Sequence, residues 1–437
     1  MALQRTATTR WASAPAHTWS RAAANVGLLA LLAASAVLAV DAAAGPSPLV
    51  PAGRRAFPGW LAGPFRAVGD PTTTDGLGVL LVVMLVAWLL VMTGARELAP
   101  RRLVIAIVTG HLIFLLAPPL LSADVFGYIG FARLGAVHHL NPYVFGTAWA
   151  PDDPVQPFLR WRNAHSPYGP LFTLGSYAVV PLGVAGAFWA FKALAFAVSL
   201  ATVALVWRIA TRLGRDPRPA AALVGLNPPL LAFEVGGGHN DALVVVLALA
   251  GIGLVLERRE ATGLGAIVLA ATLKASAGIV APFALVGARD RRGAMAGAAV
   301  AAAAVAMLAV IGFGIHAGLS VTAAARSGGR VAVHSVPSAV ARLVGADAVS
   351  PLAGTLLGLA VLVCVAGLLV GAARGADWIA CAGWATLALL CGSTWLLPWY
   401  LTWLAPLAAL GDSRRLRVAT VLFVTYVTLT RVPFVPL

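Results

Sequence analysis

The feature that most constrains this chain is a succession of long apolar runs separated by short polar segments. About 20 helical residues cross the hydrocarbon core of a bilayer. The 437-residue chain is 60% hydrophobic and 11% charged, whereas about a quarter of the residues in a soluble domain are charged. The sequence therefore predicts an all-α polytopic membrane protein, one integral membrane domain over residues 1–437 with about 11–13 transmembrane helices. The candidate spans are 25–44, 77–95, 102–120, 170–184, 186–207, 219–233, 242–256, 263–286, 294–315, 350–373, 377–395, 398–411 and 416–430.

The first run, 25–44, has an alternative interpretation as a signal peptide, because AVDAAAG contains a small-residue cleavage pattern. Its apolar stretch is long for the core of a signal peptide, which favours an uncleaved span. The three cysteines, Cys364, Cys381 and Cys391, all lie in apolar runs and fit neither a metal motif nor a disulfide framework.

The distribution of basic residues orients the chain. The net charge is +15, but the arginines cluster at the ends of apolar runs, which is typical of the cytoplasmic side of a plasma-membrane protein and not of nucleic-acid binding. Arg5, Arg10 and Arg21 place the N-terminus in the cytoplasm. Residues 121–169, with an interfacial helix, and residues 316–349 are then extracytoplasmic loops.

Two segments do not fit a simple count of crossings. The basic clusters on either side of 170–207 require an odd number of crossings, so one of its two runs should be a half-span or an interfacial helix. The run 263–286 lies between two clusters that are both predicted to be cytoplasmic. We therefore expect it to enter and return as two short half-helices, with Lys274 near the tip.

Asp124 follows an apolar run closely, in APPLLSADVFGY. A carboxylate at this place is costly unless it is paired or hydrated, which makes it a functional candidate. The structural alternative is that Ser122 or Asp124 caps the helix that follows. Capping and catalysis are compatible.

The segment GGGHND, which precedes another apolar helix, is a second candidate site. Its glycines permit close backbone approach or unusual dihedral angles. Asn240 or Asp241 could simply cap the helix, whereas a helix N-terminus with His239 beside it could bind a phosphate. The three polar residues are too few for a metal motif, but together with Asp124 they leave a divalent cation open.

The remaining cationic candidates are Lys274 and a group on the second outer loop. A lysine in an apolar run either snorkels to the interface or neutralises a lipid phosphate. Arg326, Arg330 and His334, in RSGGRVAVHS, belong either to an ordinary solvated loop or to an anion clamp.

Aromatic residues collect at the predicted outer boundary. The structural alternative is the interfacial belt of membrane proteins; the functional one is stacking on sugar rings. The candidates for acceptor or sugar binding are Tyr128, Asn141, Tyr143, Tyr168, Trp399 and Tyr400.

No Walker A motif, GxGxxG or Cys/His cluster occurs in a usable context, which disfavours an ATP-driven pump. An ion-coupled transporter would place charges near the bilayer midplane in repeated halves. Here the charges lie at the predicted mouth, and no convincing repeat is present.

Four stretches of the sequence resemble the actinobacterial polyprenol-phosphate-mannose-dependent α-1,6-mannosyltransferases, multi-pass enzymes of the GT-C fold. They are APPLLSADVFGYIGFARLGAVHHLNPYVFGT, AHSPYGPLF, LNPPLLAFEVGGGHNDALVV and ATLKASAGIVAPFALV, which run from about residue 117 to 286.

The resemblance implies a donor such as polyprenyl-phosphate-mannose, a glycan or glycolipid acceptor in the cell envelope, and an extracytoplasmic reaction that inverts the anomeric configuration. It assigns Asp124 as general base. Lys274, His239, Arg326 or Arg330 would then stabilise the leaving phosphate. Two alternatives stay open: a lipid-linked-sugar flippase without chemistry, and a transferase that uses polyprenyl-phosphate-arabinose.

Overall fold

The computed structural model describes residues 14–45, 50, 57–66, 68, 73–318 and 331–432. This described part of the chain consists of α-helices, short helical turns and connecting loops, without a β-strand. The prediction of an all-α polytopic membrane protein is therefore confirmed.

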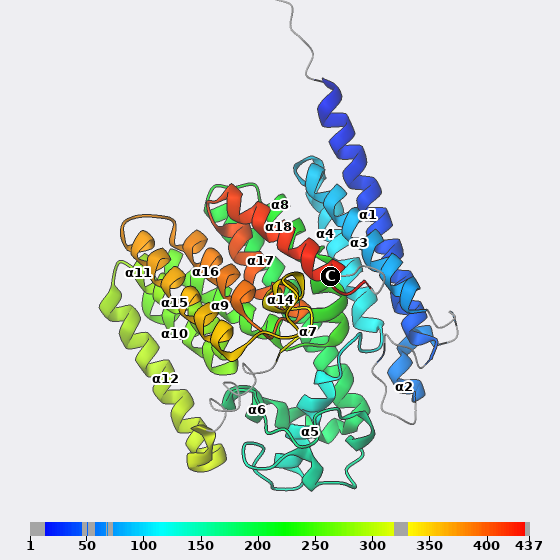
Figure 1. Cartoon of the computed structure of the whole chain (residues 1–437), viewed down its shortest axis with the longest axis vertical. Helices are drawn as coiled ribbons and strands as arrows, with labels where there is room; N and C mark the ends of the chain where they lie inside the picture. Colours follow the sequence, from blue (N-terminus) through cyan, green and yellow to red (C-terminus); the bar gives the residue numbers. More distant parts are fainter. Residues whose placement is uncertain are drawn as a thin grey trace, which may run out of the picture.

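The N-terminal helices form one side of the molecule. α1 and α3 pack against each other along their length, and α4 lies beside α1 (Figure 1). The chain then reaches α5 and α6 at the lower end of the view and returns upward through α7. The helices of this part are α1 (Ala14–Ala43), α2 (Gly59–Ala62), α3 (Thr74–Gly94), α4 (Pro100–Leu116), α5 (Asp124–Ala136), α6 (Pro170–Ser176), α7 (Gly183–Arg212) and α8 (Pro217–Gly225).

The second half packs against α7. α9 contacts α7 on one side and α10 on the other, and α12 covers α10. Small residues allow this close packing: a Cβ added at Gly251 of α9 would lie 2.6 Å from the carbonyl oxygen of Gly263 in α10. The helices are α9 (Asp241–Leu256), α10 (Glu260–Leu273), α11 (Val280–Gly287), α12 (Arg291–Phe313), α14 (Val336–Leu343), α15 (Pro351–Ala373), α16 (Trp378–Gly392), α17 (Leu401–Leu410) and α18 (Arg414–Leu429).

Five helical segments of the described chain are long and apolar enough to cross a membrane. The predicted 11–13 spans exceed this number because several apolar runs form shorter helices, such as the 16-residue α9, the 14-residue α10 and the 15-residue α16. The five segments are Trp19–Ala43, Thr74–Glu97, Pro170–Arg212, Arg291–His316 and Pro351–Ala373.

The two irregular segments of the sequence are resolved into short and long pieces. The runs at 170–184 and 186–207 become the seven-residue α6, a short helical turn and the 30-residue α7, so only α7 is itself long enough to cross. The run at 263–286 is divided into α10 and α11, and Lys274 lies at the break in an extended conformation. The predicted interruption at Lys274 is therefore present.

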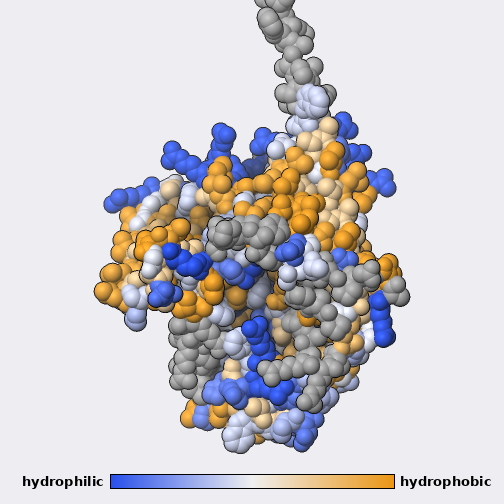
Figure 2. Space-filling model, turned by 45° about the vertical axis from the view of Figure 1, so that its right-hand side comes forward, coloured by the Kyte–Doolittle hydropathy of each residue, from blue (hydrophilic) through white to orange (hydrophobic). Residues whose placement is uncertain are grey.

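The basic clusters meet at one end of the molecule. Arg208 pairs with Glu257, Arg215 donates a hydrogen bond to the carbonyl oxygen of Leu410, and the backbone N–H of Arg289 donates to Glu260. In Figure 2, hydrophilic residues gather at the top and bottom of the visible face, and hydrophobic residues cover much of the surface between them. This distribution fits a protein that sits in a bilayer.

Candidate active site

Asp124 lies shortly after the C-terminal end of α4. Pro118 and Pro119 follow the last turn of that helix and cannot donate to continue it. Asp124 is the first residue of α5, whose N-cap residue Ala123 offers no side-chain bond, and the Ser122 Oγ accepts the Asp124 backbone N–H at 3.2 Å. Ser122 therefore supports the start of the helix, while the Asp124 carboxylate is left for other contacts.

The Asp124 carboxylate lies at a half-open position beside His239. Its Oδ2 is 3.7 Å from the Nδ1 of His239; the Asp124 side chain is 28% exposed, and that of His239 is fully buried. Burial raises the pKa of Asp124 to about 6; Lys274 opposes this shift and Asp241 adds to it. The carboxylate is thus mostly ionised at neutral pH, and its pKa lies close enough to neutral pH for it to act as a proton acceptor.

The glycines before His239 are required by close packing. A Cβ at Gly237 would lie 2.6 Å from Cδ2 and 2.8 Å from Nε2 of the His239 ring. Gly238 has a φ of 67°, in the left-handed region that glycine adopts without strain. These two residues turn the chain so that the His239 ring folds back over its own backbone.

His239 and Asn240 have aromatic neighbours. The His239 ring stacks on Trp399 with a centroid distance of 3.7 Å. Asn240 Oδ1 accepts a hydrogen bond from the Tyr128 hydroxyl at 3.3 Å, and Tyr128 makes an edge contact with Tyr168. The site therefore joins five of the predicted residues from four separate segments of the chain.

Asp241 and Lys274 form an ion pair in the interior. Lys274 Nζ lies 2.7 Å from Asp241 Oδ1, which also accepts the indole N–H of Trp403 at 2.8 Å. The ammonium group lies over the rings of Tyr400 and Trp403, at 4.7 and 5.1 Å from their centroids. Neither Asn240 nor Asp241 makes a side-chain capping bond at α9, so the capping interpretation of this segment does not describe their contacts.

Several buried polar atoms at this site have no hydrogen-bond partner within the described residues. They are Glu234 Oε2, both ring nitrogens of His239, Asn240 Nδ2 and Asp241 Oδ2. Buried polar groups in native proteins are usually paired. Their concentration beside Asp124 indicates a place where a polar ligand binds.

Sequence reasoning missed Glu234, Trp403 and Arg160. Glu234 is fully buried, and its Oε1 accepts the backbone N–H of Ala242 at 2.6 Å. A carboxylate in the apolar run LNPPLLAFEV was a usable signal, since ionisable residues within such runs are functional candidates. Arg160 lies close enough to lower the pKa of Asp124, although burial outweighs it.

Other predicted residues lie elsewhere or have structural partners. Arg326 and Arg330 lie outside the described residues. His334 precedes α14, and its carbonyl oxygen accepts a hydrogen bond from Tyr426. Asn141 donates to the carbonyl oxygen of Phe313, and the Tyr143 hydroxyl donates to the carbonyl oxygen of Tyr168.

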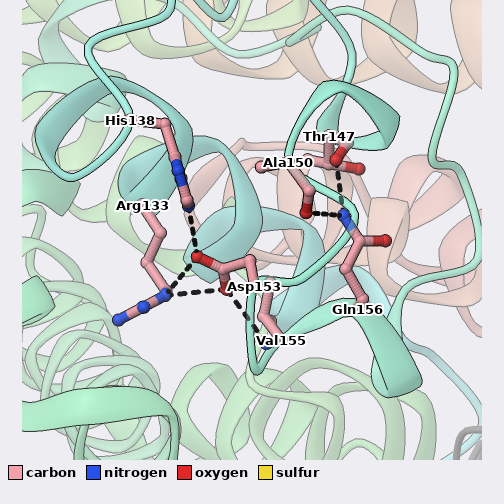
Figure 3. A network of polar contacts seen from close by, with 7 residues as sticks. All are labelled: Arg133, His138, Thr147, Ala150, Asp153, Val155 and Gln156. Carbon is pink, nitrogen blue, oxygen red and sulfur yellow. Dashed lines mark hydrogen bonds and ion pairs between the residues drawn. The ribbon is translucent and has the colours of Figure 1, made fainter.

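A separate polar network holds the loop 121–169 in shape (Figure 3). Asp153, which is buried, accepts hydrogen bonds from Arg133 Nε at 2.9 Å and from the backbone N–H of Val155 at 3.0 Å, and it contacts His138 Nε2 at 2.7 Å. Gln156 donates to the carbonyl oxygens of Thr147 and Ala150. We call these residues, Arg133, His138, Asp153 and Gln156, the α5-loop network. It ties the C-terminal part of α5 to the loop that follows.

The described residues contain no group of three or more His, Cys, Asp or Glu side chains that could hold a metal ion. The divalent cation that the sequence left open stays a hypothesis.

The profile of one protein family, described as "Alpha-(1->6)-mannopyranosyltransferase, N-terminal domain", matches residues 24–290. The chain belongs to this family. The chain is 33% identical to α-(1→6)-mannopyranosyltransferase A of Mycobacterium tuberculosis over 371 residues. This alignment covers 76% of the chain and 70% of the relative. The chain is also 33% identical over 173 residues to α-(1→6)-mannopyranosyltransferase A of Corynebacterium glutamicum, which covers 38% of this chain and 35% of that relative.

No solved structure matches this chain. The family resemblance seen in the sequence is confirmed, and the chain is a membrane mannosyltransferase. The matched segment includes Asp124, His239 and Lys274, whereas Trp399 and Trp403 lie beyond it.

Proposed function

We propose that the protein transfers mannose from polyprenyl-phosphate-mannose to a hydroxyl of a glycan or glycolipid acceptor. The product is an α-1,6 linkage, formed with inversion on the extracytoplasmic face of the plasma membrane, with the N-terminus in the cytoplasm and a GT-C arrangement of helices. The observation that carries the proposal is the half-exposed Asp124 carboxylate, 3.7 Å from buried His239 and beside unpaired buried polar atoms.

Asp124 acts as general base in this proposal. It accepts the proton of the acceptor hydroxyl while the hydroxyl oxygen attacks the anomeric carbon. The bond from that carbon to the phosphate oxygen breaks, and the polyprenyl phosphate leaves with the electron pair. A base with a pKa about one unit below neutral pH combines a large ionised fraction with useful basicity.

Lys274 and His239 stabilise the departing phosphate. Lys274 uses one donor on Asp241, and its side chain is still 23% exposed, so the ammonium can donate further hydrogen bonds. Neither ring nitrogen of His239 has a hydrogen-bond partner within the described residues. Cationic and hydrogen-bonding groups fixed beside a developing charge lower the barrier because they need no reorganisation.

The sugar is expected to lie against aromatic faces. Trp399 stacks on His239, and Tyr168 packs against Tyr128. These rings border the segment that carries Asp124 and Asn240. Arg326, Arg330 and His334 stay predicted contributors to phosphate binding from the second outer loop, and Asn141 and Tyr143 stay predicted contributors to acceptor binding.

The test is transfer by the purified protein in nanodiscs, with radiolabelled polyprenyl-phosphate-mannose and a short α-1,6-mannoside. We expect an α-mannosidase-sensitive product, and a loss of roughly 10²–10⁴-fold in kcat for Asp124→Asn. Asp152→Asn, an exposed carboxylate of the same loop, is the matched control. Full turnover by Asp124→Asn would remove Asp124 as base.

The same assay separates the alternatives. Movement of labelled lipid across the bilayer without a new glycosidic bond would support a flippase. Transfer from polyprenyl-phosphate-arabinose but not from the mannose lipid would change the donor sugar.

A further inference from the structure

Lys192, in the interior of α7, has an unusual set of partners. It is fully buried, and its Nζ donates to three carbonyl oxygens: Phe114 at 2.5 Å, Val235 at 3.1 Å and Gly236 at 2.8 Å. Three acceptors match the three N–H donors of an ammonium group. No carboxylate pairs with Lys192 within the described residues, which distinguishes it from Lys274, the other lysine of the chain.

The three carbonyl groups belong to the two segments that deliver the site. Phe114 is in the last turn of α4, just before the loop that leads to Asp124. Val235 and Gly236 end the helical turn that leads to His239. The backbone N–H of Leu120 also donates to the carbonyl oxygen of Gly236, at 3.1 Å. The ammonium group of Lys192 thus binds both the end of α4 and the helical turn before His239.

The aliphatic part of the Lys192 side chain packs beside Gly238, next to the site. A Cβ built at Gly238 would lie 3.3 Å from Cδ of Lys192 and 3.7 Å from Cγ2 of Val125. Val125 is the residue after Asp124. The turn before His239 is therefore held between the Lys192 stem and the first turn of α5, which fixes how far the carboxylate lies from the imidazole.

We propose that Lys192 is a positioning residue for catalysis, which sets the relative placement of Asp124 and His239 through the carbonyl groups of Phe114, Val235 and Gly236. It touches neither substrate nor reacting atoms. The inference rests on the proposed function, in which Asp124 is the base.

The test compares Lys192→Met with Ser199→Ala. Methionine keeps a long, flexible side chain but removes the charge and all three donors. Ser199 lies further along α7, and its hydroxyl pairs with His111 of α4 at 2.9 Å, so Ser199→Ala removes another buried polar tie between the same two helices. Both variants are assayed in nanodiscs for transfer, for kcat and KM separately, for thermal unfolding and for the pH dependence of kcat.

We expect Lys192→Met to lose about 100-fold in kcat, with KM for the donor nearly unchanged, because a displacement of about 1 Å at reacting groups has an effect of this size. The acid limb of its pH profile should also move, since Asp124 would have a new environment. Ser199→Ala should lower thermal stability but keep the kcat and pH profile of the unmodified protein.

A Lys192→Met protein with unmodified kcat and pH profile would overturn the inference, as would a loss equal to that of Ser199→Ala. If Lys192→Met does not fold, Lys192→Arg keeps the charge but changes the donor geometry. It should fold and show reduced kcat and a shifted acid limb, and unmodified kinetics would overturn the inference. Asp124→Asn is assayed in parallel: if it retains turnover, the proposed function fails, whatever Lys192 does.

Discussion

Two polar clusters of the described chain differ in how completely their polar atoms are hydrogen-bonded. In the α5-loop network, both oxygens of Asp153 accept hydrogen bonds, and the Gln156 amide nitrogen donates two. In the site around His239, five buried polar atoms of four residues have no hydrogen-bond partner within the described residues. A fully paired buried network makes a structure rigid, whereas unpaired groups raise its free energy unless something binds them. We infer that the first cluster shapes the loop and the second binds substrate.

Removal of the Lys274 charge should have a large effect on both stability and transfer. Lys274→Met leaves Asp241 and Glu234 buried without a neighbouring cation, which costs about 3–5 kcal/mol of stability. The double variant Lys274→Met/Asp241→Asn removes the unpaired Asp241 charge and should regain part of this stability. Transfer should be reduced in both by about 10²–10³-fold, since a stabilising group for the phosphate is missing.

Thermal unfolding and initial rates of transfer, measured on the same preparations, check this. Recovery of transfer along with stability in the double variant would show that the ion pair only holds the fold, as the α5-loop network does.

The pH dependence should differ between the clusters. Asp124, with a pKa raised to about 6 by burial, is protonated below that pH, so kcat/KM should fall about tenfold per pH unit there. Burial raises the pKa of Asp153, but hydrogen bonds from Arg133, Val155 and His138 outweigh it and lower the pKa overall. The stability from Asp153 is therefore present above about pH 4, the value in an unfolded chain, and is lost only as pH falls through the lower folded value.

Rates between pH 5 and 8, with circular dichroism at each pH, separate the two effects. A flat rate profile, or a loss of rate that coincides with unfolding, would contradict the role given to Asp124.

Gly237→Ala tests whether the orientation of the His239 ring matters. The added Cβ would come within 2.6 Å of that ring, so the ring should shift from its stacked place on Trp399. We expect a loss of about tenfold in kcat, which is smaller than the roughly 100-fold loss that a misplacement of about 1 Å can cause. Gly175→Ala, where no atom lies within 4 Å of the new Cβ, is the control. Equal rates for the two variants would show that the ring placement has no part in transfer.

Asp153→Asn should have the smallest effect on transfer. The amide cannot form the ion pair with Arg133, so the loop should lose about 2 kcal/mol of stability. Turnover of the folded protein should stay within about twofold of the unmodified rate, because the Asp153 carboxylate has structural partners only. Limited proteolysis within 121–169 and initial rates are the measurements. A large loss of kcat without greater proteolysis would place the network in the reaction.

The sequence predicted the parts of the site that local signals mark. Asp124 after a proline-terminated run, the glycine turn before His239 and the break at Lys274 are each visible within a few residues. Partnerships were not predictable, because tertiary packing sets them. Nothing local indicates that Lys274 pairs with Asp241, 33 residues away, or that Trp399 stacks on His239.

The same limit applies to the fold. Apolar runs identified most helices, because hydrophobicity is a local property of the sequence. Five helical segments of the described chain are long enough by themselves to cross, and other apolar runs form shorter helices, such as α4, which ends just before Pro118. Lys192 is visible in the sequence only as a single lysine in an apolar helix, and nothing local predicts that it binds two backbone segments.

The hydrogen bond between Trp403 and Asp241 joins residues 162 positions apart, and this has a consequence for biosynthesis. A membrane protein is made from its N-terminus, so Asp124, His239 and Lys274 leave the ribosome well before α17 does. Until α17 is inserted, Asp241 lacks its indole donor and Lys274 lacks its two aromatic neighbours. A nascent chain therefore carries an incomplete site, and we expect sugar transfer to begin only after α17 has been inserted.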